Sequence, residues 1–373
     1  MADRLIVMDR GEIILDGPPR KLFHEEGLAL RDKLGIFVPQ ITDLFLALMA
    51  RGIDFPFVPL TLSEAMDQIA SIKFSSKTST RVDDTVLGTS KLVDQPAVKA
   101  EKVSYHYPNA VRAVDDVSLC IQRGEFICLV GQNGSGKTTL AKVMVGLLRP
   151  QSGEITLLGR SLEQIPMAEL VGSVGYVFQY PEHQFITQTV YDEVAYSLRA
   201  RGVDENEVAK RVGEMLSLFA LQDLVHVSPF LLSKGQKRRL SVATMLISRP
   251  DLLILDEPMT GQDYRNIHNL LAILNDLRDQ GTAIIDITHD MEHVASFADR
   301  VIGLHEGRVI FDGAPAVLFN AQEILQALSL EPPPAAVIAR NLRSSGVDMP
   351  IDATTASRLI EALHFAGNPE EET

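Results

Sequence analysis

Cysteine and tryptophan are almost missing from this chain of 373 residues, which has two cysteines and no tryptophan. Two thiols, Cys120 and Cys128, exclude a secreted domain held by several disulfides, and because both lie in apolar runs we expect buried free thiols. No apolar run approaches the ~18 residues of a membrane-spanning helix. The first residues also lack the apolar core of a signal peptide. These absences predict a cytoplasmic location.

Positive charge is also scarce. The chain has 35 Lys and Arg against 49 Asp and Glu, a formal net charge of −14. Nucleic-acid binders depend on cationic contacts to phosphates, so this balance argues against a nucleic-acid partner. The apolar share of 46% is that of a globular protein, and the length predicts two to three folding units.

An internal repeat relates the two ends of the chain. Residues 2–23 and 298–319 are identical at 11 of 22 positions, at a constant offset of 296. A weaker match follows after a two-residue slip, pairing 52–56 with 346–350 and Thr61 with Thr355. The offset is far too long for a solenoid repeat. We therefore expect a duplicated large domain, of which residues 1–70 hold the C-terminal part.

The rest of the chain divides into three predicted regions. Nine of residues 71–90 are Ser or Thr, which predicts a flexible linker over 71–96. A compact unit is expected over 97–320, and an extension over 321–373 with a frayed polar end. Short apolar runs predict buried strands in the compact unit, at Phe126–Val130, Ser173–Phe178, Leu252–Leu255 and Ala283–Ile287. Helical patterns follow at Lys137–Leu148, Val190–Arg201, Glu205–Phe219, Gln236–Ser248 and Tyr264–Asp279. This alternation predicts an α/β domain with a largely parallel sheet.

A phosphate-binding loop is predicted between the first of these strands and its helix. The pattern G-x-x-x-x-G-K-[ST] is met by Gly131, Gln132, Asn133, Gly134, Ser135, Gly136, Lys137 and Thr138, and Thr139 follows. The glycines allow backbone N–H groups to approach phosphates, and the helix N-terminus favours their charge. We expect Lys137 to reach the β and γ phosphates and the Thr138 hydroxyl to bind Mg²⁺.

Two acids end a later apolar strand. Asp256 and Glu257 follow Leu252–Leu255, and in folds of this kind such a strand end lies beside the phosphate loop. We expect Asp256 in the Mg²⁺ shell and Glu257 as the base that activates water.

The segment Leu232-Ser-Lys-Gly-Gln236 resembles the signature of ABC-type ATPases, usually L-S-G-G-Q. It lies 23 residues before Asp256, as in that family. The resemblance implies that Ser233 and Gly235 meet the γ-phosphate bound by an opposite subunit. Lys234 departs from the usual Gly, and Gln236 matches. A plain Ser N-cap on a basic helix is the alternative interpretation.

Other segments fall in the order of the same family. Tyr107 resembles the aromatic residue that stacks on adenine, with core packing as the alternative. Gln179 resembles the glutamine that touches Mg²⁺ and senses the transporter, so it is counted with the metal-binding and catalytic residues. Gly261-Gln262-Asp263 resembles the loop that crosses the dimer interface. His289 resembles the switch histidine, which with Glu257 completes the catalytic set.

The resemblance covers residues 97–320 fully and 1–23 as a fragment. It implies the ABC-type nucleotide-binding fold of P-loop NTPases, with a RecA-like parallel core, an antiparallel β subdomain and an α-helical signature subdomain. Residues 178–185 and 235–239 look most like the ATPases of energy-coupling-factor (ECF) importers. That subgroup implies ATP and Mg²⁺ as ligands, integral membrane transporter subunits and a second ATPase chain as partners, and a peripheral place on the cytoplasmic face of the membrane. Vitamins and transition-metal ions all remain open as substrates.

Three alternatives remain beside the importer ATPase. A soluble ABC ATPase of DNA repair would carry a long coiled coil, and one of the ribosome would carry two complete cassettes; this chain shows neither pattern. A non-catalytic subunit would not need Glu257 and His289.

For residues 1–70 we expect a remnant of a first cassette, left by truncation or by a start assigned too late, or else an appendage folded on the C-terminal tail. Its hairpin, Leu5–Met8 and Glu12–Leu15, is marginal by itself.

Overall fold

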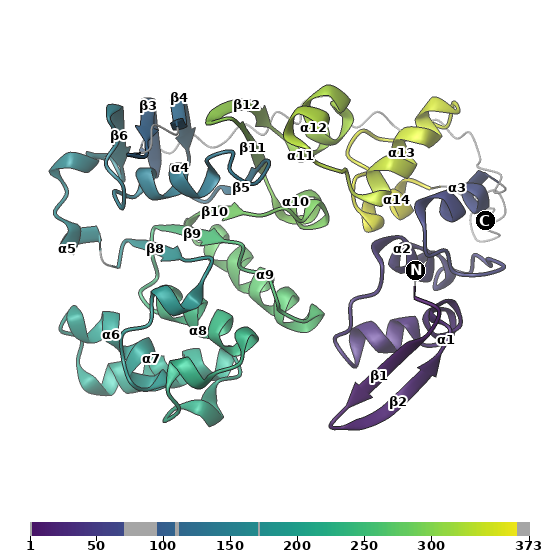
Figure 1. The fold of residues 1–373 in the computed structure, drawn as a ribbon, viewed down its shortest axis with the longest axis horizontal. Coiled ribbons are helices and arrows are strands. Elements are labelled where there is room, and N and C mark those ends of the chain that lie inside the picture. The colour runs from purple at the N-terminus through teal and green to yellow at the C-terminus, as the bar shows by residue number, and fades with distance from the viewer. Residues whose placement is uncertain (1, 71–94, 109–111, 171, 364–373) are drawn as a thin grey trace, which may run out of the picture.

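The computed structural model describes residues 2–70, 95–108, 112–170 and 172–363. Most of the linker predicted over 71–96 and the predicted frayed end therefore lie outside the described residues. Figure 1 shows two masses: the sheets with the helices below them, and a smaller group in which the N-terminal and C-terminal helices meet. No helix of the described residues is long and apolar enough to cross a membrane.

A six-stranded sheet organises the larger mass, in the order β12-β11-β5-β10-β9-β8. All neighbours are parallel except β11 and β12. Three strands at its centre are buried at every residue because helices cover both faces, which explains their unbroken apolar runs. The strands are β5 (Phe126–Val130), β8 (Val174–Val177), β9 (Leu252–Asp256), β10 (Ala283–Ile287), β11 (Arg300–His305) and β12 (Arg308–Gly313).

A second, antiparallel sheet has the order β4-β3-β6-β7. It packs over the phosphate-loop helix, α4, and shares a buried cluster with the inner face of the large sheet. One predicted buried thiol is wrong: Cys128 on β5 is buried, but Cys120 on the edge strand β4 is only partly covered. The strands are β3 (Val98–His106), β4 (Arg112–Ile121), β6 (Ser152–Leu157) and β7 (Arg160–Ser161).

The helices agree with the predicted segments except at their ends. Helix α4 stops before Gly146, whose φ of 77° ends it four residues earlier than expected. Helix α8 starts two residues earlier than expected because Ser233 caps it. The helices are α4 (Lys137–Met144), α5 (Met167–Leu170), α6 (Val190–Ala200), α7 (Glu205–Leu218), α8 (Lys234–Leu246), α9 (Tyr264–Asp279) and α10 (Met291–Phe297).

The two ends of the chain form one further unit. Residues 2–70 contain a hairpin and three helices, α11 ends the preceding unit, and the described part of the C-terminal extension, 321–363, contains three helices. Helix α2 packs against α13 and α14, so the extension and the N-terminal segment share a single hydrophobic core. The elements are β1 (Leu5–Asp9), β2 (Glu12–Gly17), α1 (Pro19–Asp32), α2 (Gln40–Met49), α3 (Leu62–Ala70), α11 (Pro315–Asn320), α12 (Gln322–Leu328), α13 (Pro334–Ser344) and α14 (Ala356–Ala362).

This shared core gives a stability prediction. Phe45 on α2 is fully buried, and its ring lies 4.5 Å from that of Phe55. Phe45→Ala should cost about 3–5 kcal/mol by removing the buried ring and leaving a cavity. Because the core is common to both ends, limited proteolysis of this variant should release the N-terminal and C-terminal helices together. Loss of residues 2–70 with α13 still protected would contradict a common core.

Candidate functional site

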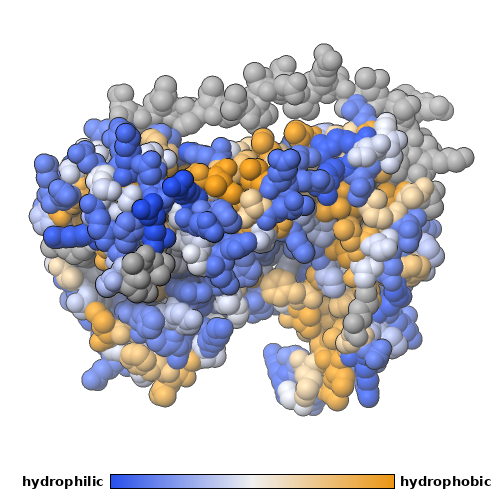
Figure 2. Space-filling model, turned by 45° about the horizontal axis from the view of Figure 1, so that its top comes forward, coloured by the Kyte–Doolittle hydropathy of each residue, from blue (hydrophilic) through white to orange (hydrophobic). Residues whose placement is uncertain are grey.

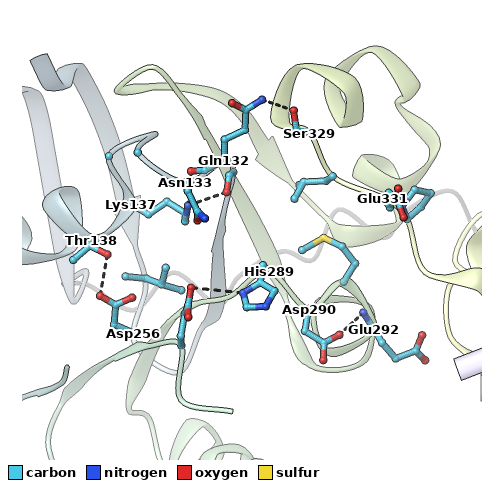
Figure 3. A pocket seen from close by; sticks show the side chains of 18 of the residues that line it. Gln132, Asn133, Lys137, Thr138, Asp256, His289, Asp290, Glu292, Ser329 and Glu331 are labelled. Carbon is cyan, nitrogen blue, oxygen red and sulfur yellow. Dashed lines mark hydrogen bonds and ion pairs between the residues drawn. The ribbon is translucent and has the colours of Figure 1, made fainter. Parts of the chain in front are cut away.

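A large open pocket, of about 1310 Å³, lies where the carboxyl ends of the parallel strands meet the C-terminal extension. Figure 3 shows the side chains around it. Every residue predicted for the phosphate loop except Ser135 lines this pocket, as do Tyr107, Thr139, Gln179, Asp256, Glu257 and His289. Segments that are 180 residues apart in the sequence therefore meet here, as expected for strand ends of a parallel sheet.

Two glycines of the loop occupy positions that no other residue fits. A Cβ on Gly131 (φ +140°) would lie 2.2 Å from the Leu304 carbonyl oxygen. A Cβ on Gly136 (φ +104°) would lie 2.0 Å from the Ala113 carbonyl oxygen. Both conformations are in the region that favours glycine. The loop backbone is thus held close to β11 and β4, with its concave side open to the pocket.

The lysine and threonine of the loop are placed for phosphate and metal chemistry. Lys137 Nζ donates to the carbonyl oxygens of Gly131 and Gln132, at 2.8 and 2.7 Å. Burial lowers the pKa of Lys137, against the opposing pull of Glu257 and Asp256. Thr138 Oγ1 donates to Asp256 Oδ2 at 2.9 Å, which joins the loop to the end of β9. Burial raises the pKa of Asp256, and the charge of Glu257 adds to this.

Glu257 and His289 face each other at the ends of β9 and β10. Glu257 Oε1 lies 3.6 Å from His289 Nδ1, and the glutamate side chain is mostly covered while the histidine is mostly exposed. Glu257 also has φ +51°, an uncommon conformation for a residue with a side chain. Glu257 lines the pocket together with Asp256, the residue before it in the chain.

Gln179 is positioned by a residue that sequence reasoning did not single out. Arg238 on α8 is 3% exposed and donates to the carbonyl oxygens of Phe178 and Gln179, at 2.7 and 2.6 Å. This arginine ties the loop after β8 to the signature helix. The sequence shows three basic residues after Gln236, but it does not show that the second of them, Arg238, is buried against the loop after β8. Tyr107 contacts the loop helix through a hydrogen bond of 3.2 Å between its hydroxyl and Thr139 Oγ1.

The signature residues lie apart from the pocket. Ser233 and Gln236 form a capping box, in which each side chain accepts from the other residue's backbone N–H. Gly235 O accepts from Gln262 Nε2 at 2.9 Å, which links the signature to the loop before α9. None of the four residues from Ser233 to Gln236 is among the described residues that line the pocket. Ser233 therefore does cap this helix, and the cap is compatible with both the signature and the plain N-cap interpretation.

The C-terminal extension closes one side of the pocket, which the sequence did not predict. Ser329 accepts a hydrogen bond from Gln132 of the phosphate loop, and the prolines at 332–334 line the same wall. Gln40 and Leu62 from the N-terminal helices also reach it. Only the packing of the two chain ends brings these residues to the site.

Glu292 on α10, which also lines the pocket, gives a pH prediction. Burial, aided by Asp290 and Asp43, raises its pKa from 4.5 to about 7. Between these pH values the folded state holds more protons than the unfolded state, so this group lowers stability as pH rises through that window. Glu292→Gln should therefore be more stable than the parent at pH 8, on the order of 1–3 kcal/mol, and no different below pH 4.5. Urea unfolding at both pH values, with the exposed Glu323→Gln as control, measures this; an equal difference at both pH values contradicts it.

A phosphate loop after a central parallel strand, joined through Thr138 to an acid at the end of a nearby strand, defines a P-loop nucleoside triphosphatase. The comparisons with known proteins narrow this class. The family model described as ABC transporter matches residues 114–260. An energy-coupling factor transporter ATP-binding protein, EcfA1 of Geobacillus kaustophilus, is 37% identical over 271 residues, 72% of this chain and 97% of that protein. The chain belongs to the family of ABC transporter ATP-binding proteins.

Further similarity comes from a longer relative and from a solved structure. A protein of Methanosarcina acetivorans named as an ABC transporter ATP-binding protein is 37% identical over 360 residues, 94% of this chain and 58% of that protein. This chain thus spans about 58% of the length of that relative. The structure of cbiO1 from Clostridium perfringens, part of the ABC transporter complex cbiONQ, has a TM-score of 0.54 at 32% identity and covers 62% of this chain and 94% of that one. The expected fold, with its parallel core, antiparallel subdomain and helical subdomain, is confirmed.

Proposed function

We propose that this chain binds and hydrolyses ATP and energises an importer of the ECF type from the cytoplasmic face of the membrane. The observation that carries the proposal is the convergence of Lys137, the Thr138–Asp256 pair and Glu257 in one pocket. The ECF assignment is supported by the similarity to EcfA1 over 97% of that protein. The substrate class, a vitamin or a transition-metal ion, depends on the membrane subunits and stays open.

The chemistry of the pocket fits a nucleoside triphosphate. Gly131 and Gly136 let the loop backbone pack closely on Leu304 and Ala113, and the Ser135 hydroxyl is buried without a hydrogen-bond partner among the described residues. Among the described residues, the hydrogen-bond partners of Lys137 Nζ are carbonyl oxygens, so a phosphate would supply an anionic partner. In this proposal Tyr107 stacks on the base and residues 131–139 hold the phosphates.

The donors around Thr138 fit a magnesium ion. Its hydroxyl, the Asp256 carboxylate and the Gln179 side chain are hard oxygen ligands of the kind Mg²⁺ prefers. When bound, Mg²⁺ neutralises charge on the phosphates. Glu257 accepts the proton of the attacking water, and His289 orients that carboxylate and contacts the γ-phosphate side of the pocket.

Hydrolysis in this proposal needs a second ATPase subunit. Ser233, Lys234 and Gly235 lie outside the pocket of their own chain, so they serve the γ-phosphate bound by the partner. They lie at the N-terminus of α8, and a helix N-terminus favours an anion. Lys234 adds a positive charge at this point and is exposed.

The surface after Gln179 suits a membrane partner. A groove of about 590 Å³ lies along α6, lined by Thr187, Gln188, Asp192, Tyr196, Arg199 and Ala200. Tyr196 in this lining is 52% exposed, and Ile186, which precedes Thr187 in the chain, is 64% exposed. Exposed apolar side chains around a groove are typical of a surface that accepts a helix.

Co-purification from detergent extracts tests the transport assignment. A tagged chain should recover an integral membrane protein, and Tyr196→Asp should lower that recovery while ATP binding is kept. Glu214→Gln, on the exposed face of α7, serves as the control. Recovery of no integral membrane protein would contradict the importer assignment and favour a soluble ABC ATPase.

A further inference from the structure

The β1–β2 hairpin has the same geometry as the β11–β12 hairpin. Each ladder shifts its register at the equivalent step, between Val7 and Met8 and between Gly303 and Leu304. Each turn has two residues of positive φ, 47° and 86° in the first and 47° and 79° in the second. The pairs that correspond at an offset of 296 are Leu5–Gly17 with Val301–Gly313, and the ion pair Arg4–Asp16 with Arg300–Asp312.

One face of β1 is packed and the other is open. Val7 is 4% exposed in the core shared by the chain ends, and Leu5 packs beside it. On the opposite face Ile6 is 46% and Met8 61% exposed. Their equivalents on β11, Ile302 and Leu304, are 0% exposed. The open face of β1 therefore has apolar side chains at positions that are buried in β11, but nothing in the described residues covers them.

The difference lies in what pairs with the strand. On the edge away from β12, β11 pairs in parallel with β5, from Arg300 opposite Ile127 to Gly303 opposite Val130. Within the described residues, β1 pairs with β2 alone. Its other edge thus presents unpaired backbone groups beside the open apolar face. Figure 1 shows the hairpin projecting from the smaller mass. Figure 2 shows hydrophobic residues at the surface of the same smaller mass.

We propose that the edge and open face of β1 form a docking surface for a second nucleotide-binding core. The occupant is a nucleotide-binding core of the same fold as residues 95–297. Its phosphate-loop strand pairs in parallel with β1, as β5 pairs with β11. Ile6, Met8 and Ile13, the last 59% exposed, then contact that core as Ile302, Leu304 and Val309 contact theirs. This inference rests on the cassette assignment and adds a second phosphate loop to the same assembly.

A fusion tests the proposal on the whole chain. Residues 95–297 are placed before Ala2, so that Phe297 joins Ala2 as it joins Ala298 in the chain itself. Backbone amides of residues 4–7 should exchange with solvent at least tenfold more slowly than in the unfused chain, and ATP binding should rise from one to two per chain.

The matched control carries Ile6→Lys and Met8→Lys. In the fusion this pair should restore fast exchange at residues 4–7, while in the unfused chain it should leave unfolding of the cassette unchanged. Unaltered exchange of β1 in the fusion, or an added segment that proteases remove, overturns the proposal. Protected β1 amides without ATP binding at either loop would instead contradict the proposed function and leave the docking supported.

Discussion

Glu257→Gln should keep ATP binding and lower the steady-state rate of ATP hydrolysis by roughly 10²–10⁴, the range expected for loss of a general base. The amide has the shape of the carboxylate but cannot accept the proton of the attacking water. Glu257 is the acid that faces His289 at 3.6 Å in the pocket. Phosphate release by the purified protein, with its membrane partner where hydrolysis requires one, measures the change.

Glu214→Gln provides the matched control, since that glutamate is exposed on α7, away from the pocket. It should hydrolyse ATP at the parent rate. Equilibrium binding of ATP should be the same for parent, control and Glu257→Gln. An undiminished rate in Glu257→Gln would remove this residue from the catalytic set, and a loss of ATP binding would show that it supports the loop instead.

His293→Ala should lower the free energy of unfolding by about 3–5 kcal/mol, the loss typical when one partner of a buried, hydrogen-bonded polar pair is removed. His293 Nε2 lies 2.7 Å from Asp286 Oδ2, and the two side chains are 4% and 0% exposed. Without the histidine, the Asp286 carboxyl group on β10 remains buried and loses this hydrogen-bond partner. Urea unfolding of the purified variants measures the loss.

A double variant separates the effect of the polar pair from the effect of side-chain packing. Asp286→Val with His293→Leu removes both polar groups and fills the space with apolar side chains, so it should unfold near the parent's free energy or above it. The Cys128 thiol completes this buried group, and burial raises its pKa well above the ordinary value. The thiol therefore stays neutral. An equal loss in the single and double variants would assign the effect to the ring contacts of His293 with Phe126 and Phe297.

The sequence predicted the bounds of helices and strands correctly where a single local pattern determines them. The buried strands β5 and β10 and helix α9 have the predicted bounds, because a run of apolar residues or a helical period is itself the signal. Errors occurred at ends governed by caps. For α8 the helical period predicts a start at Gln236, whereas the Ser233 cap starts the helix at Lys234, and for α4 it predicts an end at Leu148, whereas Gly146 follows an end at Met144. Cys120 was expected to be buried because its run is apolar, but an edge strand exposes part of it.

The sequence by itself determined the phosphate loop, the Asp256–Glu257 pair and the signature, because each depends on residue types at fixed short spacing. The tertiary structure alone decided that Arg238 holds the loop of Gln179, that Ser329 and Glu292 wall the pocket, and that Asp286 and His293 pair in the core. These contacts join residues whose separation along the chain carries no signal. The same holds for the hairpin near Leu5: the repeat was legible in the sequence, but only packing shows that Ile6 and Met8 lack the cover that Ile302 and Leu304 have, since burial depends on which strand lies alongside.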